Sequence, residues 1–285
     1  MNKLRIAIQK DGRLSEKSLE MLREAGIMLN NGSRTLVSQS STFPLEVLFL
    51  RDDDIPQYVE DGVADVGIVG ENVCAESSCN IQIIERLGFS RCRLSIAIPK
   101  NQDYRGPADL EKKKIATSYP GILSEFLKRS GVGAEIHVIS GSVEIAPGIG
   151  LADAIFDIVS SGSTLISNGL KEVEVVMNSE AVLISNRHLD QEKAMILENL
   201  IFRMRSVMAA VNNKYILLNA PDDKLEEIIR VIPGMKSPTV MPLARPGWSS
   251  VHSVLSEKQF WEVIDRLREL GAQGILVVPI EKMIV

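Results

Sequence analysis

Cysteine, histidine and aromatic residues are scarce in this sequence, and their scarcity excludes several classes of protein. The three cysteines form no CxxC pair and the three histidines are scattered, so the sequence favours neither a disulfide framework nor a zinc site. No run of about 18 apolar residues is present to span a bilayer, and the N-terminal residues lack the apolar segment of a secretory signal. We therefore expect a cytosolic protein, with no membrane partner, in which Cys74, Cys79 and Cys92 are free thiols.

A large excess of charge of one sign is also missing. The 285 residues include 32 lysines and arginines against 37 aspartates and glutamates, which gives a formal charge of −5. Such a chain has no global field to hold a polyanion, so no nucleic acid is expected as a partner, and an anionic ligand must be held by a local site. With 45% hydrophobic and 24% charged residues the composition is that of a globular protein, and the length suggests about two domains.

Short aliphatic runs alternate with helical stretches through the first part of the chain, which predicts α/β lobes with largely parallel strand pairing. The expected strands are Leu4–Gln9, Leu45–Leu50, Val66–Val69, Ile81–Leu87, Arg93–Pro99, Ile115–Thr117, Glu135–Ser140 and Ala154–Ser160. Ser15 is placed to cap the first helix and Gly26 to end it. A further helix is expected over Gly121–Arg129.

The last part of the chain follows a different pattern. One long helix is predicted over Gln191–Asn213, because the stretch lacks proline and glycine and its apolar positions share one face: Ile196, Leu200, Met204 and Val207. The order of elements after it is βαββαβ, which is typical of a ferredoxin-like α+β unit. These elements are Tyr215–Asn219, Asp222–Val231, Thr239–Leu243, Ser250–Leu255, Glu257–Leu270 and Gln273–Pro279.

The most informative segment is a strand that carries an acid, Asp157, and runs into a loop rich in hydroxyl groups. The loop consists of Ser160, Ser161, Gly162, Ser163 and Thr164. After a strand of an α/β domain, such a loop can aim backbone N–H groups and hydroxyls at a phosphate, and the carboxylate would then face the hydroxyls of an attached ribose. The alternative is a polar turn in which Asp157 caps the backbone.

The segment Glu144–Leu165 resembles, position for position, the signature of the ATP phosphoribosyltransferase family, whose members catalyse the first step of histidine biosynthesis. Further segments also resemble that family: Gln9–Leu14, Arg51–Pro56, Val66–Asn72, Ala116–Pro120 and Pro279–Lys282. The resemblance covers nearly the whole chain. It implies a two-lobed, periplasmic-binding-protein-like α/β catalytic core with a C-terminal ferredoxin-like regulatory domain.

The resemblance also implies domain boundaries and a reaction. Lobe I would comprise residues 1–95 and 180–212, lobe II residues 96–179, and the regulatory domain residues 213–285. The family transfers the phosphoribosyl group of phosphoribosyl pyrophosphate to N1 of ATP, giving N1-(5-phospho-ribosyl)-ATP and pyrophosphate, with Mg²⁺ as cofactor. Displacement at an anomeric carbon has oxocarbenium character, so positioning and charge control are needed more than a protein nucleophile. Mg²⁺ keeps waters and takes substrate phosphates as ligands, so no dedicated metal cage is expected.

The resemblance assigns residues to phosphoribosyl pyrophosphate. Ser160 to Leu165 would wrap its 5′-phosphate. Either Asp157 or Glu144 would accept hydrogen bonds from the ribose hydroxyls, and Asp153 is a weaker candidate. The residues implied to bind phosphoribosyl pyrophosphate are Glu144, Asp157, Ser160, Ser161, Gly162, Ser163, Thr164 and Leu165.

A second group is implied for catalysis and for ATP. Lys10 and Arg13 would meet pyrophosphate or ATP phosphate charge at the carboxyl end of the first strand, or else form an exposed basic turn. Glu71 would contact the nucleotide or a metal-bound water, or would simply be an acid at a helix start. The catalytic candidates are Lys10, Arg13, Arg51 and Glu71, and the ATP candidates are Gly12, Asp53, Gly70, Ser118 and Tyr119. Tyr119 would stack on adenine or pack beside Pro120.

The C-terminal unit marks the long form of the family, in which histidine is a feedback inhibitor. The histidine candidates are Asn219, Ser237, Thr239 and Gly274, although an acid at position 219 would suit the ligand's ammonium better. Ordinary turns between strands are the alternative. Long-form relatives switch between an active dimer and an inhibited hexamer, so a homo-oligomer is expected. The long helix and exposed tryptophans are candidate interfaces; Trp248 is expected to be exposed, whereas Trp261 is expected in the core.

The sequence also allows two other functions. A non-catalytic two-lobed sensor of a small metabolite could use the same cleft, although an amino-acid sensor would not need a 5′-phosphate loop. A phosphoribosyltransferase with another nitrogen nucleophile is disfavoured only through the resemblance of the N-terminal and second-lobe motifs.

Overall fold

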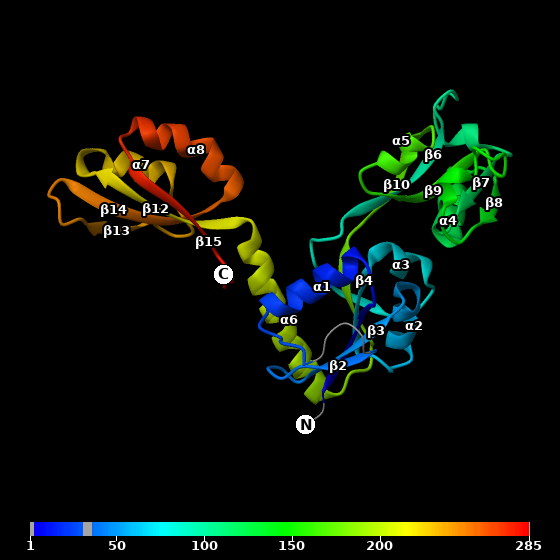
Figure 1. Ribbon diagram of the computed structural model, residues 1–285, viewed down its shortest axis with the longest axis horizontal. Coiled ribbons are helices and arrows are strands. Elements are labelled where there is room, and N and C mark those ends of the chain that lie inside the picture. The colour runs from blue at the N-terminus through cyan, green and yellow to red at the C-terminus, as the bar shows by residue number, and fades with distance from the viewer. Residues whose placement is uncertain (1–2, 31–35, 285) are drawn as a thin grey trace. The chain divides into compact units, whose positions relative to one another are not determined.

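The computed structural model describes residues 3–30 and 36–284 (Figure 1). The ends of the expected domains at residues 1 and 285 lie outside the described residues. The chain divides into two compact units: the first holds most residues up to Glu198, and the second holds Glu24–Gly26 with the residues from Asn199 onward. No helix within the described ranges is long and apolar enough to cross a membrane.

The first unit contains two sheets, and each belongs to one lobe. In the first sheet the strand order is β2 (Val37–Gln39), β3 (Leu45–Leu50), β1 (Leu4–Gln9), β4 (Val66–Gly70), β11 (Ala181–Ser185) and β5 (Gln82–Arg86). In the second sheet the order is β10 (Leu170–Ser179), β6 (Cys92–Pro99), β9 (Ala154–Val159), β7 (Lys114–Thr117) and β8 (Glu135–Val138). The helices are α1 (Arg13–Glu24), α2 (Ile55–Glu60), α3 (Glu71–Glu76), α4 (Pro120–Ser130) and α5 (Ser163–Ser167).

The expected strands are present, but the expectation of largely parallel pairing is wrong. Strand β1 is parallel to β3 and β4, and β7 is parallel to β8 and β9, whereas β2, β6, β10 and β11 all pair antiparallel to their neighbours. The reason lies in the connections. The chain passes between the sheets directly, over residues 86–92 and again over 179–181, and parallel neighbours would need a longer crossover.

The first helix also differs from its expected start. Helix α1 begins at Arg13, directly after Gly12, so Ser15 lies inside the first turn instead of capping it. The Ser15 side chain is buried, and its hydroxyl donates to the backbone oxygen of Lys10 over 3.3 Å. Gly26 follows the helix with a φ of +77°, in agreement with its expected role as a stop.

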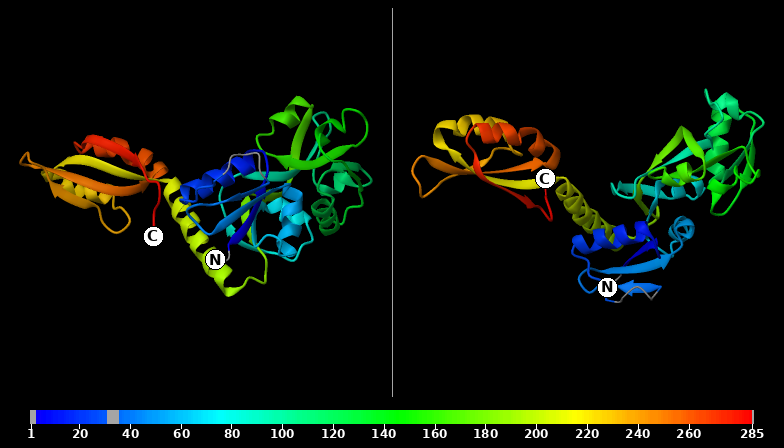
Figure 2. Two further views of the ribbon diagram at one scale, coloured as in Figure 1. Left: turned by 60° about the horizontal axis from the view of Figure 1, so that its bottom comes forward. Right: turned by 45° about the horizontal axis from the view of Figure 1, so that its top comes forward.

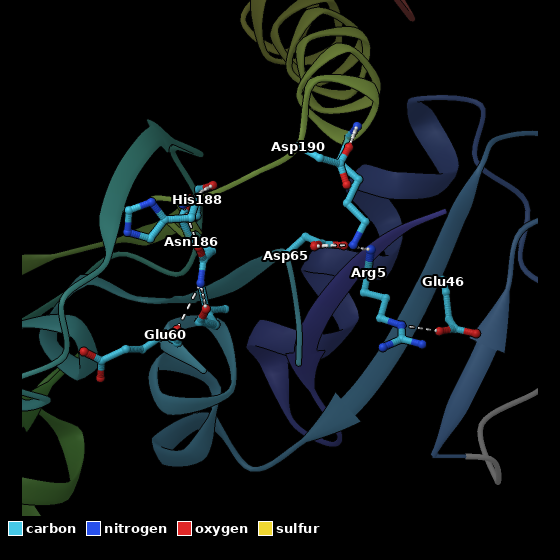
Figure 3. A network of polar contacts seen from close by, with 10 residues as sticks. Arg5, Glu46, Glu60, Asp65, Asn186, His188 and Asp190 are labelled. Atoms are coloured by element: carbon cyan, nitrogen blue, oxygen red, sulfur yellow. Dashed lines mark hydrogen bonds and ion pairs between the residues drawn. The ribbon is translucent and has the colours of Figure 1, made fainter. Parts of the chain in front are cut away.

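A buried polar network joins the start of α6 (Gln191–Val211) to the first sheet (Figure 3). The Asp65 carboxylate accepts the backbone N–H of Arg5 and pairs with the ammonium of Lys193, each over 2.8 Å. Asn186 donates to the backbone oxygens of Val59 and Glu60. Because Asp65 is buried, these partners satisfy a charge that would otherwise destabilise the fold. Along α6, Leu197, rather than the half-buried Ile196, is buried before the expected positions: Leu200, Met204 and Val207.

The second unit has the expected ferredoxin-like order. Its sheet runs β13 (Thr239–Pro242), β14 (Trp248–Ser256), β12 (Asn213–Pro221), β15 (Gln273–Pro279), with antiparallel pairs throughout. Helices α7 (Leu225–Val231) and α8 (Glu257–Glu269) cover one face of this sheet, as both views in Figure 2 show. The expected fold of two α/β lobes followed by a ferredoxin-like domain is confirmed.

The expectations for the two tryptophans are wrong. Trp261 is 67% exposed, while the adjacent Phe260 is buried. The buried stripe of α8 runs through Phe260, Ile264 and Leu267 at helical spacing, which leaves Trp261 one step outside it. Trp248 is half-buried instead of exposed, and the guanidinium of Arg245 lies 5.8 Å from its ring centroid.

Candidate functional site

The hydroxyl-rich loop after β9 borders a cavity of about 550 Å³ in the first unit. Gly162 turns the chain there with a φ of +78°, a conformation that glycine adopts without strain, and α5 begins at the next residue. The residues that line the cavity are Arg13, Glu144, Ile155, Asp157, Ile158, Val159, Ser160, Ser161, Gly162, Ser163, Thr164 and Leu165. The structure therefore brings together the whole set that the sequence associated with phosphoribosyl pyrophosphate, and adds Arg13 from the first lobe.

The loop presents hydrogen-bond donors that the protein itself does not use. The exposed hydroxyls of Ser161 and Ser163 form one hydrogen bond with each other over 2.9 Å, so the second of these two O–H donors remains open. Among the described residues, no group accepts the backbone N–H of Gly162, Thr164 or Leu165. Unpaired backbone amides and hydroxyls that converge on an open cavity form a favourable site for an anion.

Two basic side chains on β6 and just after it hold the loop in place. The guanidinium of Arg93 donates to the backbone oxygen of Ser160 over 3.1 Å and is paired with the carboxylate of Glu172 on β10. The ammonium of Lys100 donates to the backbone oxygen of Ile166 over 3.1 Å. These anchors are not recognisable in the sequence, because each lies more than sixty residues from its partner and carries no motif.

Asp157 and Glu144 place two carboxylates beside the loop. Burial raises the pKa of Asp157 above the ordinary value of an aspartate, and the charge of Glu144 raises it further, while the N–H of Ile158 partly offsets both effects. Asp153, the weaker candidate, accepts the backbone N–H of Lys114 over 2.8 Å and lines a separate cavity of about 310 Å³. The arrangement therefore separates Asp153 from the other two acids.

The first-lobe candidates lie at the carboxyl ends of β1 and β3. Lys10 is exposed, and its backbone N–H donates to the backbone oxygen of Leu50 over 2.8 Å, which ties the two strand ends together. Gly12, with a φ of +94°, forms the turn before Arg13. Arg51 and Asp53 are exposed after β3. The pKa of Asp53 is raised by partial desolvation and then by the neighbouring aspartates.

Tyr119 is the candidate that links the two lobes electrostatically. Its ring packs against the core of the second lobe, and burial raises the pKa of its phenol. Asp157 raises this pKa further, as do Asp52 and Asp53 of the first lobe, so the hydroxyl lies within electrostatic reach of both groups of acids. Ser118 donates its hydroxyl to the backbone oxygen of Ile139 over 2.7 Å, which fixes the segment before Tyr119.

Gly70 and Glu71 are not brought to this cavity. Glu71 lines a different cavity, of about 290 Å³, beside the segments that pass between the sheets, and its carboxylate is paired with the guanidinium of Arg86. Of the histidine candidates in the second unit, Gly274 and Asn219 are neighbours: a Cβ on Gly274 would lie 3.2 Å from the Asn219 side-chain nitrogen. Ser237 and Thr239 are exposed, and Thr239 pairs with His252 on β14.

The cavity fits a magnesium ion that is shared with a phosphorylated substrate better than one held by protein alone. No group of three or more histidine, cysteine, aspartate or glutamate side chains within residues 3–30 and 36–284 could hold a metal. Asp157 and Glu144 do lie close enough for one charge to raise the pKa of the other acid. Carboxylate oxygens are the ligand type that Mg²⁺ prefers, and the ion otherwise keeps waters and binds phosphates, so these acids fit an ion that a substrate phosphate also holds.

Comparisons with known proteins match nearly the whole chain. Residues 51–206 match the model of the ATP phosphoribosyltransferase family, and residues 210–282 match that of the HisG C-terminal domain. An ATP phosphoribosyltransferase of Bacteroides fragilis is 65% identical over 282 residues, covering 99% of this chain and all of the relative. That of Phocaeicola vulgatus is 64% identical over 281 residues, or 99% of each chain.

A solved structure is also similar. It is a chain of the ATP phosphoribosyl transferase (HisG:HisZ) complex from Thermotoga maritima, 27% identical, with a TM-score of 0.61. The match covers 71% of this chain and 98% of that chain. The shorter solved chain therefore corresponds to only part of this one.

Proposed function

This chain belongs to the ATP phosphoribosyltransferase family, and from that premise we propose that the cavity beside the loop Ser160–Thr164 binds phosphoribosyl pyrophosphate. The chain catalyses the first step of histidine biosynthesis, in which ATP and phosphoribosyl pyrophosphate give N1-(5-phospho-ribosyl)-ATP and pyrophosphate. The C-terminal domain identifies it as the long form. The observation that carries the site assignment is the convergence of unpaired amides, hydroxyls, Asp157 and Glu144 on one cavity.

The loop would hold the 5′-phosphate of the donor. Its amides and hydroxyls are already oriented by the Arg93 and Lys100 anchors, so little reorganisation is needed when the phosphate arrives. The ribose attached to that phosphate would then lie over the end of β9. There Asp157 and Glu144 can accept hydrogen bonds from its hydroxyls, and protonation of Asp157 would weaken it as an acceptor because the negative charge is lost.

Charge control around the anomeric carbon follows from the same geometry. Positive charge develops on the ribose as the bond to pyrophosphate breaks, and a nearby carboxylate stabilises that charge. Arg13 lines the cavity and, with Lys10 at the same strand end, would stabilise the departing pyrophosphate. Mg²⁺, held by substrate phosphates with Asp157 or Glu144, would supply further neutralisation of the diphosphate. The mechanism assigns no role to a protein nucleophile.

The acceptor ATP would approach from the side of the first lobe. Gly12, Arg51 and Asp53 lie at the strand ends that face this side, and Ser118 and Tyr119 mark the corresponding edge of the second lobe. The charges of Asp157, Asp52 and Asp53 all raise the pKa of Tyr119, which supports a position at the meeting of both lobes, and an adenine ring could lie against the tyrosine there. Glu71 lines the other cavity and Gly70 directly precedes it, so we assign both residues to the connection between the lobes rather than to ATP.

Regulation and assembly are proposed from the C-terminal domain. We propose that residues 213–285 form a regulatory domain in which Asn219 and Gly274 contribute to a histidine site, with Ser237 and Thr239 as further candidates. Lobe I would comprise residues 1–95 with 180–212, and lobe II residues 96–179. A homo-oligomer, dimeric or hexameric, would carry the inhibition, since an effector must favour one of two states to act at a distance. We propose that the enzyme works in the cytoplasm.

The direct test is formation of the product. ATP, Mg²⁺ and phosphoribosyl pyrophosphate are mixed with the protein, and the ultraviolet absorbance of the phosphoribosylated adenine is followed, with omission of each component as a control. We expect absorbance to rise only in the complete mixture. A protein that binds phosphoribosyl pyrophosphate in calorimetry but forms no product would contradict the catalytic proposal and favour a sensor.

A further inference from the structure

Helix α4 begins without a cap of its own. Tyr119 occupies the N-cap position, and its side chain makes no capping hydrogen bond, while Pro120 at the first helical position has no N–H. The N–H of Leu123 reaches the backbone oxygen of Tyr119 over 3.2 Å. The backbone N–H groups of Gly121 and Ile122 are therefore left for a partner outside the helix.

That partner is Glu76, which comes from the other lobe. Glu76 ends α3, and its two carboxylate oxygens accept separately: Oε1 from the N–H of Gly121 over 2.7 Å and Oε2 from the N–H of Ile122 over 2.9 Å. A carboxylate at a helix start also interacts favourably with the helix dipole. Charge-assisted bonds of this kind are stronger than neutral ones, and the half-buried position of Glu76 limits solvent screening.

The opposite end of α3 is fixed to the segment that carries the chain back between the sheets. The N–H of Glu71 donates to the backbone oxygen of Glu180 over 2.9 Å. The hydroxyl of Ser179 accepts the N–H of Asn72 over 3.1 Å and donates to its side-chain oxygen over 2.8 Å, and both residues are only 4% exposed. A Cβ at position 70 would lie 2.4 Å from that oxygen, so any larger residue there would displace the Asn72 side chain from its bond to Ser179.

We propose that α3 is a strut between the lobes and that Glu76 is a positioning residue for the acceptor side of the reaction. The strut holds the chain crossing at one end and the start of α4 at the other. Ser118 and Tyr119 directly precede α4, so the position of its first turn sets where Tyr119 stands relative to Asp52 and Asp53 of the first lobe. The loop Ser160–Thr164 lies on another strand end and has its own anchors. The kinetic part of this proposal rests on the proposed function.

The first experiment does not depend on catalysis. Hydrogen exchange at the Gly121 and Ile122 amides is measured in the parent protein, Glu76→Ala, Glu76→Gln and the control Glu125→Ala, which removes an exposed acid from α4. We expect exchange to be at least about tenfold faster in Glu76→Ala, intermediate in Glu76→Gln and unchanged in the control. Equal protection in all four proteins would overturn the strut.

The second experiment separates positioning from stability. In Glu76→Ala we expect kcat/KM for ATP to fall about tenfold, whereas calorimetric affinity for phosphoribosyl pyrophosphate stays within about twofold of the parent value. If Glu76→Ala melts at a lower temperature but its kinetics are unchanged, Glu76 only caps α4 and the proposed positioning role is wrong. Absence of product from the parent protein would instead reject the proposed function, and the exchange experiment would still decide the strut.

Gly121→Ala supplies a variant that keeps Glu76. A Cβ at position 121 would lie 3.0 Å from Oε1 of Glu76, so the carboxylate must shift, although alanine is the better helix former. We expect Gly121→Ala to lower kcat/KM for ATP about threefold in the parent and to have no effect in Glu76→Ala. Additive effects in the double variant would contradict the proposal.

Discussion

Two helices of the second lobe start in comparable places and are used differently. Helices α4 and α5 follow the adjacent parallel strands β7 and β9, so both begin at the same edge of one sheet. At α5 the amides and hydroxyls of the first turn remain open beside a cavity. At α4 the two free amides are occupied by Glu76. A strand followed by a helix therefore predicts backbone amides that can bind an anion. The surrounding residues decide whether that anion is a ligand or a carboxylate of the protein itself.

We expect the largest loss of affinity for phosphoribosyl pyrophosphate when the open N-terminus of α5 is blocked. Gly162→Val places a β-branched side chain at a φ of +78° and into the loop, so affinity for phosphoribosyl pyrophosphate should fall at least about 100-fold in calorimetry. Gly131→Val is the matched control, because Gly131 has a φ of +65° at the end of α4, away from the loop. Retained affinity in the Gly162 variant would place the phosphate elsewhere.

A smaller effect, about tenfold in affinity, is expected for Asp157→Asn, since a carboxylate that accepts ribose hydroxyls is lost. Burial raises the pKa of Asp157, so the parent should lose affinity as pH falls through a value above the ordinary 3.8, and the variant should lack this loss. The raised pKa also makes ionised Asp157 unfavourable for folding, so the variant should melt higher near neutral pH. Identical pH profiles in calorimetry would instead point to Glu144.

A smaller loss of affinity is expected when an anchor of the loop Ser160–Thr164 is removed and the residues proposed to contact phosphoribosyl pyrophosphate are kept. Arg93→Ala removes the bond to the backbone oxygen of Ser160, and we expect about a threefold loss of affinity for phosphoribosyl pyrophosphate. Arg93 also lowers the pKa of Glu172, which stabilises the fold above the ordinary pKa of a glutamate and ceases to do so as pH falls through the lowered value. Melting curves at decreasing pH should therefore converge for parent and variant. Persistent separation at low pH would argue that Arg93 acts through packing.

We expect the smallest kinetic effect at the N-terminus of α4, whose amides Glu76 already occupies. Tyr119→Phe keeps the ring against the second-lobe core and removes only the hydroxyl, so KM for ATP should rise about twofold while affinity for phosphoribosyl pyrophosphate is unchanged. Tyr119→Ala, which removes the ring, should raise KM for ATP further if adenine packs there. Steady-state kinetics with each substrate varied in turn would measure both. A change confined to phosphoribosyl pyrophosphate would place Tyr119 on the donor side.

The sequence predicted the features that depend on neighbouring residues. Strand β9, the turn at Gly162 and the hydroxyls after it are contiguous, so their spacing allowed either a phosphate loop or a polar turn, and the family resemblance favoured the phosphate loop. The βαββαβ order of the last domain was likewise readable from local patterns. The roles of individual site residues stay predictions, because they concern ligands.

Contacts between distant segments could not be predicted in the same way. Glu76 and Gly121 are 45 residues apart, and a glutamate at the end of a short helix carries no signal that it will cap another. Antiparallel pairing arose because the chain changes sheets without a helix, which strand patterns do not reveal. Trp261 was expected in the core because it lies in an amphipathic helix, but the buried stripe of that helix runs through Phe260 and Leu267 and leaves Trp261 outside.

The pairing of β5 with β11 has a consequence for the modularity of the chain. Arg86 and Val182 are register partners in an antiparallel pair, so the point where the chain leaves the first sheet and the point where it returns are adjacent. The second lobe is therefore an insertion between two adjacent antiparallel strands, β5 and β11, of the first lobe. If the second lobe is deleted and a tight turn joins Arg86 to Val182, the sheet of the first lobe should still form. The second lobe could also be exchanged for that of a relative.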